Sequence, residues 1–377
     1  MTPTVAYFAN QFAAAEGHGM RRYAFELYDA ITELGGAQLV PAAGWSNLAP
    51  DALSDLQTRT SLRLMKTGRK GTSLAWTLAG FPPMEWMMPD QLDVVHSVCM
   101  GYPVATRKPL VVTIHDLGPL THPEFFSHNR PWVMERALKQ AVDKAATVVA
   151  ISQATADEIL SLHPQAADRV RVVHSGVAER FFDEPDPAAL DGLDLPPDDV
   201  PFILTAGSLN PRKNVLGVMQ ALRHALQDIP HHLVLAGGGG WDMEQLQQEL
   251  GSSDLAARVH RLGFVSDEAL RALYRRAAMY LHPSLYEGFG LTLLEAMAAG
   301  TPVVTSNRSS LPEIAGDAAL LVDPTDPNAI AEAVIRLAND QGLVDTLREK
   351  GFARARSFSW NKTAQTMKEI YQDAASG

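Results

Sequence analysis

Two glutamates stand eight positions apart in the segment HPSLYEGFGLTLLEAMAAG. Glu287 lies in a turn that contains two glycines, and Glu295 lies in LTLLEAMAAG, a run that would be apolar on every side of a helix. Such a helix is normally buried, and an unpaired carboxylate in a buried helix is strongly destabilising. We therefore expect Glu295 to have a partner.

The turn before this helix has the features of an anion site. The predicted strand AMYLHPS leads into it, and Gly288 and Gly290 let the backbone approach a ligand closely. The first N–H groups of a helix lack partners and lie at the positive end of the helix dipole. Two carboxylates beside a bound anion make sense if they accept hydrogen bonds from hydroxyl groups. A sugar nucleotide offers both kinds of group; the alternative is that Glu295 pairs with a structural arginine.

Positive charge for a diphosphate is available in the segment LTAGSLNPRKN. Arg212 and Lys213 follow a predicted strand, FILTAGS, and precede a predicted helix, NVLGVMQALRHAL. Arginine offers a planar fork and lysine a compact charge, and both suit phosphate oxygens. We expect these two side chains to meet the diphosphate, because ligands of α/β folds bind outside the carboxyl ends of the strands.

Short β-rich runs alternate with helical patterns along the chain, which is typical of an α/β protein with parallel sheets. The acid- and proline-rich segment 181–201 lacks apolar periodicity, so we expect a linker there. We predict two doubly wound, Rossmann-like domains, 1–195 and 196–360, and a C-terminal helix, 361–377, that is free to pack back on the first domain. The expected strands are TVAYFA, DVVHS, PLVVTIH, ATVVAIS and RVRVVHS in the first half, and FILTAGS, HHLVLAGG, RVHRLG, AMYLHPS, PVVTS and AALLVD in the second.

The composition narrows the class of protein. The 377-residue chain is too long for one ordinary core, has a formal net charge of -11 and contains one cysteine, Cys99. The acidic balance argues against nucleic acid as a partner, and a single cysteine excludes an internal disulfide. Since there is no long apolar run and no secretory signal at the start, we expect a cytoplasmic protein. The oligomeric state stays open.

The second half of the chain resembles glycosyltransferase family 4. The resemblance rests on RKN, on GFVSDEALRALYRRAAMYLHPS and on LYEGFGLTLLEAMAAGTPVV, and it is nearly continuous over 202–338. It implies a retaining enzyme that uses a nucleotide sugar and has the GT-B fold, in which two Rossmann-like domains face a central cleft. The family signature is a pair of glutamates in the form E-x7-E, which Glu287 and Glu295 reproduce.

The resemblance also implies a role for each part of this segment. Glu287 would contact hydroxyls of the donor sugar, and Glu295 would bind the ribose hydroxyls. Arg212 and Lys213 would neutralise the leaving diphosphate. The remaining donor-side contacts would come from the backbone, at Gly288, Phe289, Gly290 and Leu291 for the hexose and diphosphate and at Phe264 and Val265 for the nucleobase.

Two segments of the first half resemble the same family. EGHGMRRY is similar to its acceptor-side loop, which implies acceptor contacts for Gly17, Gly19 and Arg22 and places Gly19 near the donor as well. In VVTIHDLGPLTHPEFF, His115 stands at a strand end, from which it can donate to a sugar hydroxyl or to charge at the reacting carbon. Asp116 would orient His115 or cap the next segment. The predicted catalytic residues are His115, Glu287, Arg212 and Lys213.

No D-x-D motif is present, with which other sugar transferases hold a divalent cation. We therefore expect neither a metal nor a cofactor, so the charge of the departing diphosphate falls to Arg212, Lys213 and the helix start. No acidic residue of the first half is an evident nucleophile. This favours same-face attack, in which the acceptor hydroxyl attacks from the side of the leaving diphosphate. The expected reaction moves a hexose to a hydroxyl of a glycan, lipid-linked or small-molecule acceptor, and the resemblance slightly favours mannose from GDP-mannose.

Basic and aromatic residues accumulate between 56 and 88 in an otherwise acidic chain. Such a stretch suits anionic lipid head groups, although a solvated loop is the simpler interpretation. Peripheral contact with the inner face of a membrane stays open. The residues are Arg59, Arg63, Lys66, Arg69, Lys70, Trp76, Phe81, Trp86, Met87 and Met88.

Three other classes of protein compete with this interpretation. A non-catalytic nucleotide-sugar-binding protein would share the cleft, and a phosphorylase or an epimerase could share the GT-B shape. A nicotinamide dehydrogenase is disfavoured, because AGGGGWDMEQL does not give a G-x-G-x-x-G turn with a suitable acid further on. The products formed would separate the first two classes from a glycosyltransferase.

Overall fold

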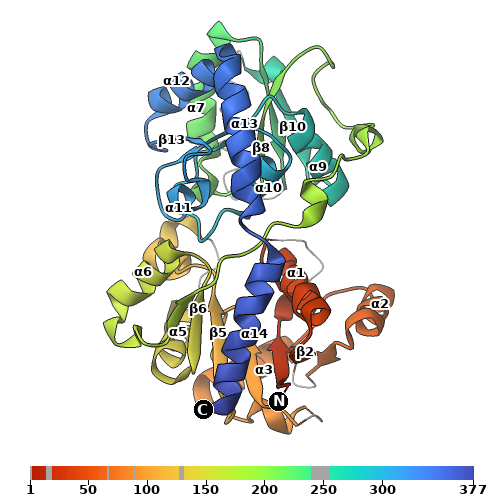
Figure 1. Ribbon diagram of the computed structural model, residues 1–377, viewed down its shortest axis with the longest axis vertical. Coiled ribbons are helices and arrows are strands. Elements are labelled where there is room, and N and C mark those ends of the chain that lie inside the picture. Colours follow the sequence, from red (N-terminus) through yellow and green to blue (C-terminus); the bar gives the residue numbers. More distant parts are fainter. Residues whose placement is uncertain (1, 14–18, 66–67, 89–90, 127–130, 239–254) are drawn as a thin grey trace. The chain divides into compact units, whose positions relative to one another are not determined.

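The computed structural model of the protein describes residues 2–13, 19–65, 68–88, 91–126, 131–238 and 255–377. The chain divides into two compact units, one formed by 1–176 together with 360–377 and the other by 177–359. Figure 1 shows each unit as a sheet with helices packed against it. Among the described residues, no helix combines the length and the apolar character that a membrane span requires.

Seven parallel strands form the sheet of the first unit, in the order β3-β2-β1-β4-β5-β6-β7. The direction of winding reverses between β1 and β4, and the carboxyl ends of these two strands are the switch point of the sheet. The strands are β1 (Thr4–Phe8), β2 (Gln38–Ala43), β3 (Arg63–Leu64), β4 (Val94–Ser97), β5 (Leu110–Ile114), β6 (Thr147–Ala150) and β7 (Val170–Val172).

The pleat of these strands sends alternate side chains to opposite faces. On one face, the Tyr7 hydroxyl donates to the Ala24 carbonyl of α1 at 2.8 Å. On the other face, Phe8 packs edge to face against Trp76 of α3. Aliphatic side chains of the strands and of α5 complete the core on that side. The helices of this unit are α1 (Gly19–Leu34), α2 (Pro50–Thr60), α3 (Gly68–Ala79), α4 (Gly118–Thr121), α5 (Pro131–Lys144), α6 (Gln153–Leu162) and α14 (Trp360–Ser376).

The C-terminal helix α14 belongs to the first unit although it follows the second unit in sequence, and it lies alongside α1 (Figure 1). Its buried Tyr371 hydroxyl lies 2.7 Å from Nδ1 of His96, and Nε2 of the same ring lies 2.8 Å from the Thr113 hydroxyl. Burial lowers the pKa of His96 to about 3, so the ring is neutral. One buried histidine therefore connects α14 to two neighbouring strands.

Six parallel strands form the sheet of the second unit, in the order β10-β9-β8-β11-β12-β13. Here the winding reverses between β8 and β11, so the switch point lies at the carboxyl ends of these strands. The strands are β8 (Phe202–Ala206), β9 (His232–Ala236), β10 (Val259–Gly263), β11 (Met279–His282), β12 (Val303–Ser306) and β13 (Leu320–Val322).

Helices pack against both faces of this sheet. On one face, Ile203, Leu233 and Leu281 join an aliphatic core with α7 and α12. On the other face, Tyr280 of β11 packs edge to face against Tyr274 of α9 at 5.3 Å between ring centroids. The helices are α7 (Val215–Asp228), α9 (Asp267–Arg276), α10 (Leu291–Ala298), α11 (Leu311–Ala315), α12 (Pro327–Asn339) and α13 (Gln341–Arg356).

The predicted α/β class with two Rossmann-like sheets is confirmed, and a strand is present in every run expected to form one. The sequence did not predict β2 and β3. Pro41 lies inside β2 and argues against a strand, because proline cannot donate to a sheet. The structure accommodates it because β3 pairs with β2 only at Ala42 and Ala43, beyond the proline.

The boundary between the units differs from the expected one. The first unit ends at Gly176, and the segment 181–201, expected as a linker between domains, is part of the second unit. Arg276 of α9 holds this segment, since its guanidinium donates to the Pro196 carbonyl at 3.0 Å and pairs with Asp198 at 2.9 Å. Polar contacts thus fix a segment that has no apolar periodicity of its own.

We expect the His96–Tyr371 contact to stabilise the first unit. Tyr371→Phe leaves a buried ring nitrogen without its partner, so the free energy of unfolding should fall by about 1–3 kcal/mol. Gln372→Ala, at an exposed residue of the same helix, is the control and should change it by less than about 0.5 kcal/mol. Urea unfolding followed by circular dichroism measures both, and equal effects would contradict the role assigned to His96.

Candidate functional site

The candidate site lies at the switch point of the second sheet. The loop after β8 contains Arg212 and Lys213 in a short 3-10 helix, Pro211–Lys213, and the loop after β11 contains Glu287. The two loops are joined by backbone, because the Leu285 N–H donates to the Arg212 carbonyl at 2.7 Å. Asn214 follows with a left-handed backbone and begins α7. Residues distant in sequence therefore meet at the edge where α/β proteins bind ligands.

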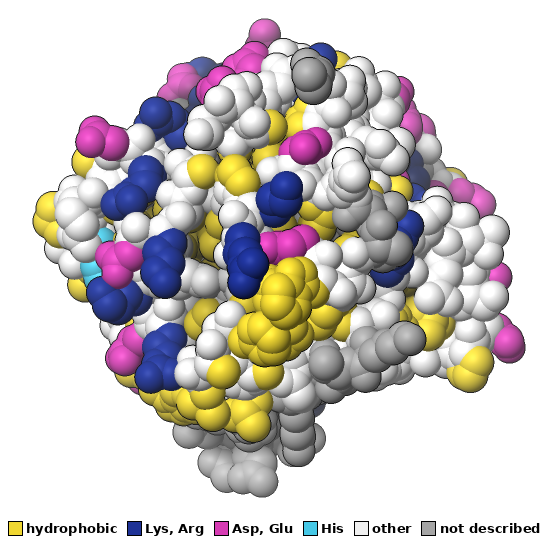
Figure 2. All heavy atoms as spheres, turned by 90° about the horizontal axis from the view of Figure 1, so that it is seen from below, with side chains coloured by type: hydrophobic (Ala, Val, Ile, Leu, Met, Phe, Trp, Pro, Cys, Tyr) yellow, Lys and Arg dark blue, Asp and Glu magenta, His cyan; other side chains and the backbone are white. Residues whose placement is uncertain are grey.

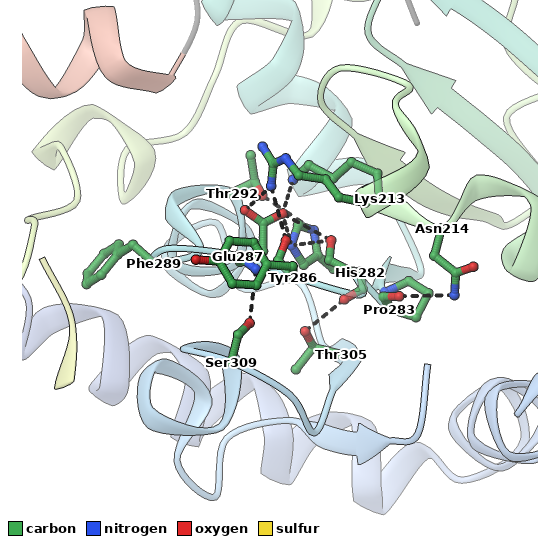
Figure 3. A network of polar contacts seen from close by, with 12 residues as sticks. Lys213, Asn214, His282, Pro283, Tyr286, Glu287, Phe289, Thr292, Thr305 and Ser309 are labelled. Carbon is green, nitrogen blue, oxygen red and sulfur yellow. Dashed lines mark hydrogen bonds and ion pairs between the residues drawn. The ribbon is translucent and has the colours of Figure 1, made fainter. Parts of the chain in front are cut away.

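Glu287 forms ion pairs with both cations (Figure 3). Its Oε2 lies 2.5 Å from Arg212 Nη1, and its Oε1 lies 2.7 Å from Lys213 Nζ. Glu287 and Lys213 are each 8% exposed, whereas the Arg212 side chain is 24% exposed. Arg212 also donates to the Tyr286 carbonyl at 3.3 Å. The structure thus brings three predicted site residues into one partly open cluster.

The charges of this cluster depend on one another. Burial alone would raise the pKa of Glu287, but Arg212, Lys213 and the hydrogen bond from His282 hold it well below its usual range. Burial lowers the pKa of Lys213, and the Glu287 carboxylate opposes that shift. Glu287 is therefore ionised at neutral pH. Arg212, Lys213 and Glu287 together carry one net positive charge, and Glu295 lies near Lys213 as a further carboxyl group.

Polar side chains on neighbouring elements hold Glu287 in place. The Ser284 hydroxyl donates to Oε1 at 3.1 Å, and the His282 ring lies 3.4 Å from the same oxygen. The backbone N–H of Glu287 donates to the Ser309 hydroxyl at 2.9 Å (Figure 3). The Ser310 hydroxyl lies 2.9 Å from the carbonyls of Glu287 and Phe289. Both the carboxylate and its turn are therefore fixed.

The predicted glycine turn leads directly into α10. Gly290 has a φ of 108° and precedes Leu291, the first residue of the helix, without a capping side chain. A Cβ on Gly290 would come within 2.9 Å of Leu311 Cδ2, so both the backbone conformation and the space require glycine. Gly288 and Phe289 are buried in the same turn. The start of α10 thus has the form expected for the hexose and diphosphate contacts, which stay a prediction.

Glu295 has a partner inside the protein. It is 1% exposed, and the Tyr274 hydroxyl of α9 donates to its Oε2 at 3.4 Å. It also lies close enough to Lys213 to act on the charge of that amine. The sequence suggests a ribose or a structural arginine as the partner, and the Tyr274 hydroxyl is one partner that neither alternative included. The ribose contact stays a prediction, and it requires this enclosed carboxylate to become accessible.

The predicted nucleobase residues follow another strand of the same sheet. Phe264 comes directly after β10 and is 75% exposed, and Val265 beside it is half-buried. An aromatic ring this exposed offers a flat surface on which a base can stack. Because β10 is parallel to β8, Phe264 lies at the same edge of the sheet as Arg212 and Lys213.

His115 directly follows β5 of the first unit and is held in one orientation. Its Nε2 lies 3.0 Å from the Val98 carbonyl, and its ring packs edge to face against Tyr23 at 4.6 Å between ring centroids. Since a carbonyl only accepts, Nε2 carries the proton and Nδ1 is left as an acceptor. Burial lowers the pKa of His115 to about 4, so the ring is neutral. In this arrangement Nδ1 accepts, whereas the sequence led us to expect a donor.

The other predicted residues of the first unit fall into three groups. Asp116 accepts from the backbone N–H of Gly118, the first residue of α4, at 3.0 Å. Gly19 is the first residue of α1, and Arg22 lies half-buried in the first turn of that helix. Gly17 lies outside the described residues. No group of three or more His, Cys, Asp or Glu side chains in the described part of the chain could hold a metal ion.

Sequence reasoning missed the residues that surround the two glutamates. From AMYLHPS, which contains Tyr280, His282 and Ser284, the sequence predicts only a strand, and it assigns no role to Tyr274. The available signal was the alternation in AMYLHPS, where Tyr280, His282 and Ser284 share the i, i+2, i+4 spacing of one strand face. A polar face on a buried strand indicates a buried hydrogen-bond network.

The stretch 56–88 contains both buried and exposed members. Trp76 and Met88 are buried, and Arg59 pairs with Asp29 at 2.7 Å. The exposed aromatics are Phe81 and Trp86, whose rings pack edge to face at 5.3 Å. Lys66 lies outside the described residues, as do the side chains of Arg69 and Lys70. In the described part of this stretch, buried and ion-paired members therefore alternate with an exposed aromatic pair.

The ion pairs of Glu287 predict a pH-dependent stability. Glu287→Gln leaves Lys213 buried without a counter-ion, so the free energy of unfolding at neutral pH should fall by about 3–5 kcal/mol. Because the folded pKa of Glu287 is depressed, its contribution is complete above the ordinary value of 4.5 and is lost as the pH falls through the folded value.

Urea unfolding of the wild type and of Glu287→Gln across this range tests that prediction. The difference between the two proteins should be constant above pH 4.5 and should shrink below it. Adding Lys213→Met to Glu287→Gln removes the stranded cation and should restore part of the stability. A small difference that does not depend on pH would contradict the ion pairs described above.

Two family models match this chain. Glycosyl transferases group 1 matches residues 194–354, and Glycosyltransferase Family 4 matches residues 17–180. The chain is 31% identical to O-antigen chain mannosyltransferase B of Escherichia coli over 360 residues, which cover 93% of this chain and 94% of that protein. It is 29% identical to a D-inositol 3-phosphate glycosyltransferase of Streptomyces bingchenggensis, covering 77% of this chain and 68% of that protein.

Solved structures with the GT-B fold resemble both units. Sucrose-phosphate synthase of Thermosynechococcus elongatus gives a TM-score of 0.75 at 22% identity over 98% of each chain. HepE of Anabaena, in complex with UDP and glucose, gives a TM-score of 0.70 at 19% identity over 97% of this chain and 98% of that one. The expected fold and family are therefore confirmed, and the chain belongs to the group 1 glycosyltransferases.

Proposed function

We propose that this glycosyltransferase moves mannose from GDP-mannose to a hydroxyl of a glycan, lipid-linked or small-molecule acceptor, with retention at the anomeric carbon and without a metal. One observation carries the proposal: a net positive cluster of Arg212, Lys213 and Glu287 lies at the switch point of the second sheet. The relatives named mannosyltransferases favour mannose.

The two cations supply what a leaving diphosphate needs. Glu287 holds them in place before the substrate arrives, so little reorganisation is needed when negative charge develops on the departing group. The start of α10 adds backbone N–H groups and the positive end of a helix dipole. These groups perform the task for which other transferases use a divalent cation, which supports a reaction without metal.

Glu287 suits the recognition of sugar hydroxyls better than nucleophilic attack. Its pKa is held well below the usual range, so it stays ionised and can accept hydrogen bonds. Both carboxylate oxygens are already paired with cations, which lowers their reactivity toward carbon. We therefore assign retention to same-face attack, in which the acceptor oxygen bonds to the anomeric carbon, the diphosphate leaves and a diphosphate oxygen takes the acceptor proton.

The remaining roles follow from placement in each unit. Glu295 would bind the ribose hydroxyls, and Phe264 with Val265 would meet the base. In the first unit, Nδ1 of His115 would accept from a sugar hydroxyl. The acceptor-side contacts are assigned to the start of α1, with Gly19 and Arg22.

Donor consumption tests this function. A thermal-shift panel of nucleoside diphosphates and their sugars should show that GDP and GDP-mannose raise the melting temperature, because ligands stabilise the state they bind. Mannose transfer should then survive EDTA, and proton NMR of the product should show the anomeric configuration of the donor. Glu287→Ala should reduce kcat/KM by about a hundredfold or more, whereas His224→Gln, at an exposed histidine of α7, should not.

Other outcomes of this test would contradict particular parts of the proposal. Normal turnover by Glu287→Ala would contradict the assignment of the site. An inverted product would exclude same-face attack, and loss of activity in EDTA would exclude the metal-free reaction. Free sugar 1-phosphate or an epimerised nucleotide sugar would indicate a phosphorylase or an epimerase, and binding without turnover would indicate a non-catalytic protein.

We also propose peripheral contact of the first unit with the anionic inner face of a membrane. Beside the exposed pair Phe81 and Trp86, Arg107 stacks over the Trp86 ring at 5.1 Å, and Lys108 follows it exposed. Figure 2 shows hydrophobic side chains gathered beside several Lys and Arg side chains on one face. Aromatic rings next to cations suit the boundary between lipid head groups and acyl chains. The net charge of -11 makes such a local basic surface informative.

Sedimentation with phosphatidylglycerol vesicles tests this contact. The wild type should sediment at low salt, and the double variant Phe81→Ser with Trp86→Ser should stay in the supernatant. Leu162→Ser, at another exposed apolar residue of the same unit, is the control and should sediment like the wild type. Failure of the wild type to sediment at any anionic lipid content would rule out the membrane role.

A further inference from the structure

A buried histidine that the proposed reaction does not use lies against Glu287. His282 is the last residue of β11 and is 2% exposed. Its Nδ1 lies 2.9 Å from the Tyr280 hydroxyl, and its Nε2 lies 3.2 Å from the Ser284 hydroxyl and 3.4 Å from Glu287 Oε1. Burial and the nearby Lys213 lower the pKa of His282 to about 4, although Glu287 opposes this shift. The ring is therefore neutral at neutral pH and carries one proton on one of two nitrogens.

One tautomer surrounds Glu287 with donors. If the Tyr280 hydroxyl donates to Nδ1, the proton of His282 is on Nε2 and points toward Ser284 and Glu287. The Ser284 hydroxyl is then free to donate to Oε1 at 3.1 Å. Together with Lys213 at 2.7 Å, Oε1 faces three donors. With three donors directed at it, this oxygen is a weak acceptor for a further hydrogen bond.

The other tautomer withdraws two of these donors without moving a heavy atom. The Tyr280 hydroxyl can instead donate to the Ala206 carbonyl at 3.3 Å, which leaves its oxygen to accept from Nδ1–H. Nε2 then has a free lone pair, which accepts from the Ser284 hydroxyl. Of the three donors, Lys213 alone remains on Oε1. The carboxylate charge is then less neutralised, which makes Glu287 a stronger acceptor for a further hydrogen bond.

We infer that His282 is a positioning residue whose tautomer sets how strongly Glu287 accepts hydrogen bonds from the donor sugar. The inference rests on the proposed role of Glu287 in holding sugar hydroxyls. Without sugar, the Nε2–H form is favoured because it directs the proton toward the carboxylate. A sugar hydroxyl that donates to Oε1 favours the Nδ1–H form. The proton lost from Nε2 is regained at Nδ1, so the charge of the ring does not change.

NMR of the full-length protein with 15N-labelled histidine tests the switch directly, because the nitrogen that carries the proton is identified by its shift and couplings. His282→Gln assigns the signal. We expect Nε2–H in the free protein and with GDP, and Nδ1–H with GDP-mannose; UDP and UDP-glucose are the second pair of probes. The same tautomer in all states, or a change with the nucleoside diphosphate alone, would overturn the inference.

Binding and kinetics give a second measurement. His282→Gln cannot change tautomer, so affinity and kcat/KM for the nucleotide sugar should fall about tenfold to a hundredfold, the range of a hydrogen bond to a charged group. Affinity for the nucleoside diphosphate should stay within about twofold, since that ligand makes no sugar contact. His224→Gln is the matched control and should change neither. Ser284→Ala, which deletes a smaller group at the same network, serves if His282→Gln does not fold.

The outcomes separate this inference from the proposed function. A wild type that transfers sugar, with variants that match it in both affinities, would overturn the role of His282 alone. Equal losses for the nucleotide sugar and the nucleoside diphosphate would indicate a merely structural role and would also overturn it. A wild type that consumes neither nucleotide sugar would overturn the proposed function and the inference together.

Discussion

A carboxylate buried between two cations is the constraint on which the site depends. Glu287 could not remain ionised at 8% exposure without Arg212 and Lys213, and Lys213 could not remain charged without Glu287. The cations come from the loop after β8 and the carboxylate from the loop after β11, so the cluster requires that these strands be neighbours. The parallel sheet reverses its winding between them, which opens both loops toward the same edge. The cluster is net positive and partly open, which fits a site for an anionic substrate.

Glu295 is connected to Glu287 through buried polar side chains. Glu295 lies on α10, which is apolar on most sides, and the Tyr274 hydroxyl donates to it at 3.4 Å. Tyr274 packs against Tyr280, and Tyr280 contacts His282, which reaches Glu287. The two acids are thus surrounded by one continuous set of buried polar groups. Most of these groups are neutral, so they orient the acids without competing with a substrate for charge.

Much of the fold could be predicted from the sequence, because strands of parallel sheets are short apolar runs between turns. The predicted pairs of site residues were also local: Arg212 with Lys213 in one loop, and the glutamates eight positions apart. What the sequence could not give is contact across the sheet, such as that between Arg212 and Glu287. It also could not separate buried from exposed aromatics, because Trp76 and Trp86 share one stretch and differ only in tertiary packing. Pro41 prevented the prediction of β2, because a proline is tolerated in a strand only where the neighbouring strand needs no hydrogen bond from it. The sequence does not show where that neighbouring strand, β3, begins.

A crystal structure of the protein with GDP-mannose would test the central claim most directly. The cluster that follows β8 and β11 should contact the ligand on both sides of the bond that breaks, the bond between mannose and the diphosphate. The account predicts diphosphate oxygens within hydrogen-bond distance of Arg212 and Lys213, and a mannose hydroxyl donating to the Glu287 carboxylate. A nucleotide sugar bound elsewhere, with the three side chains still paired only to one another, would contradict it.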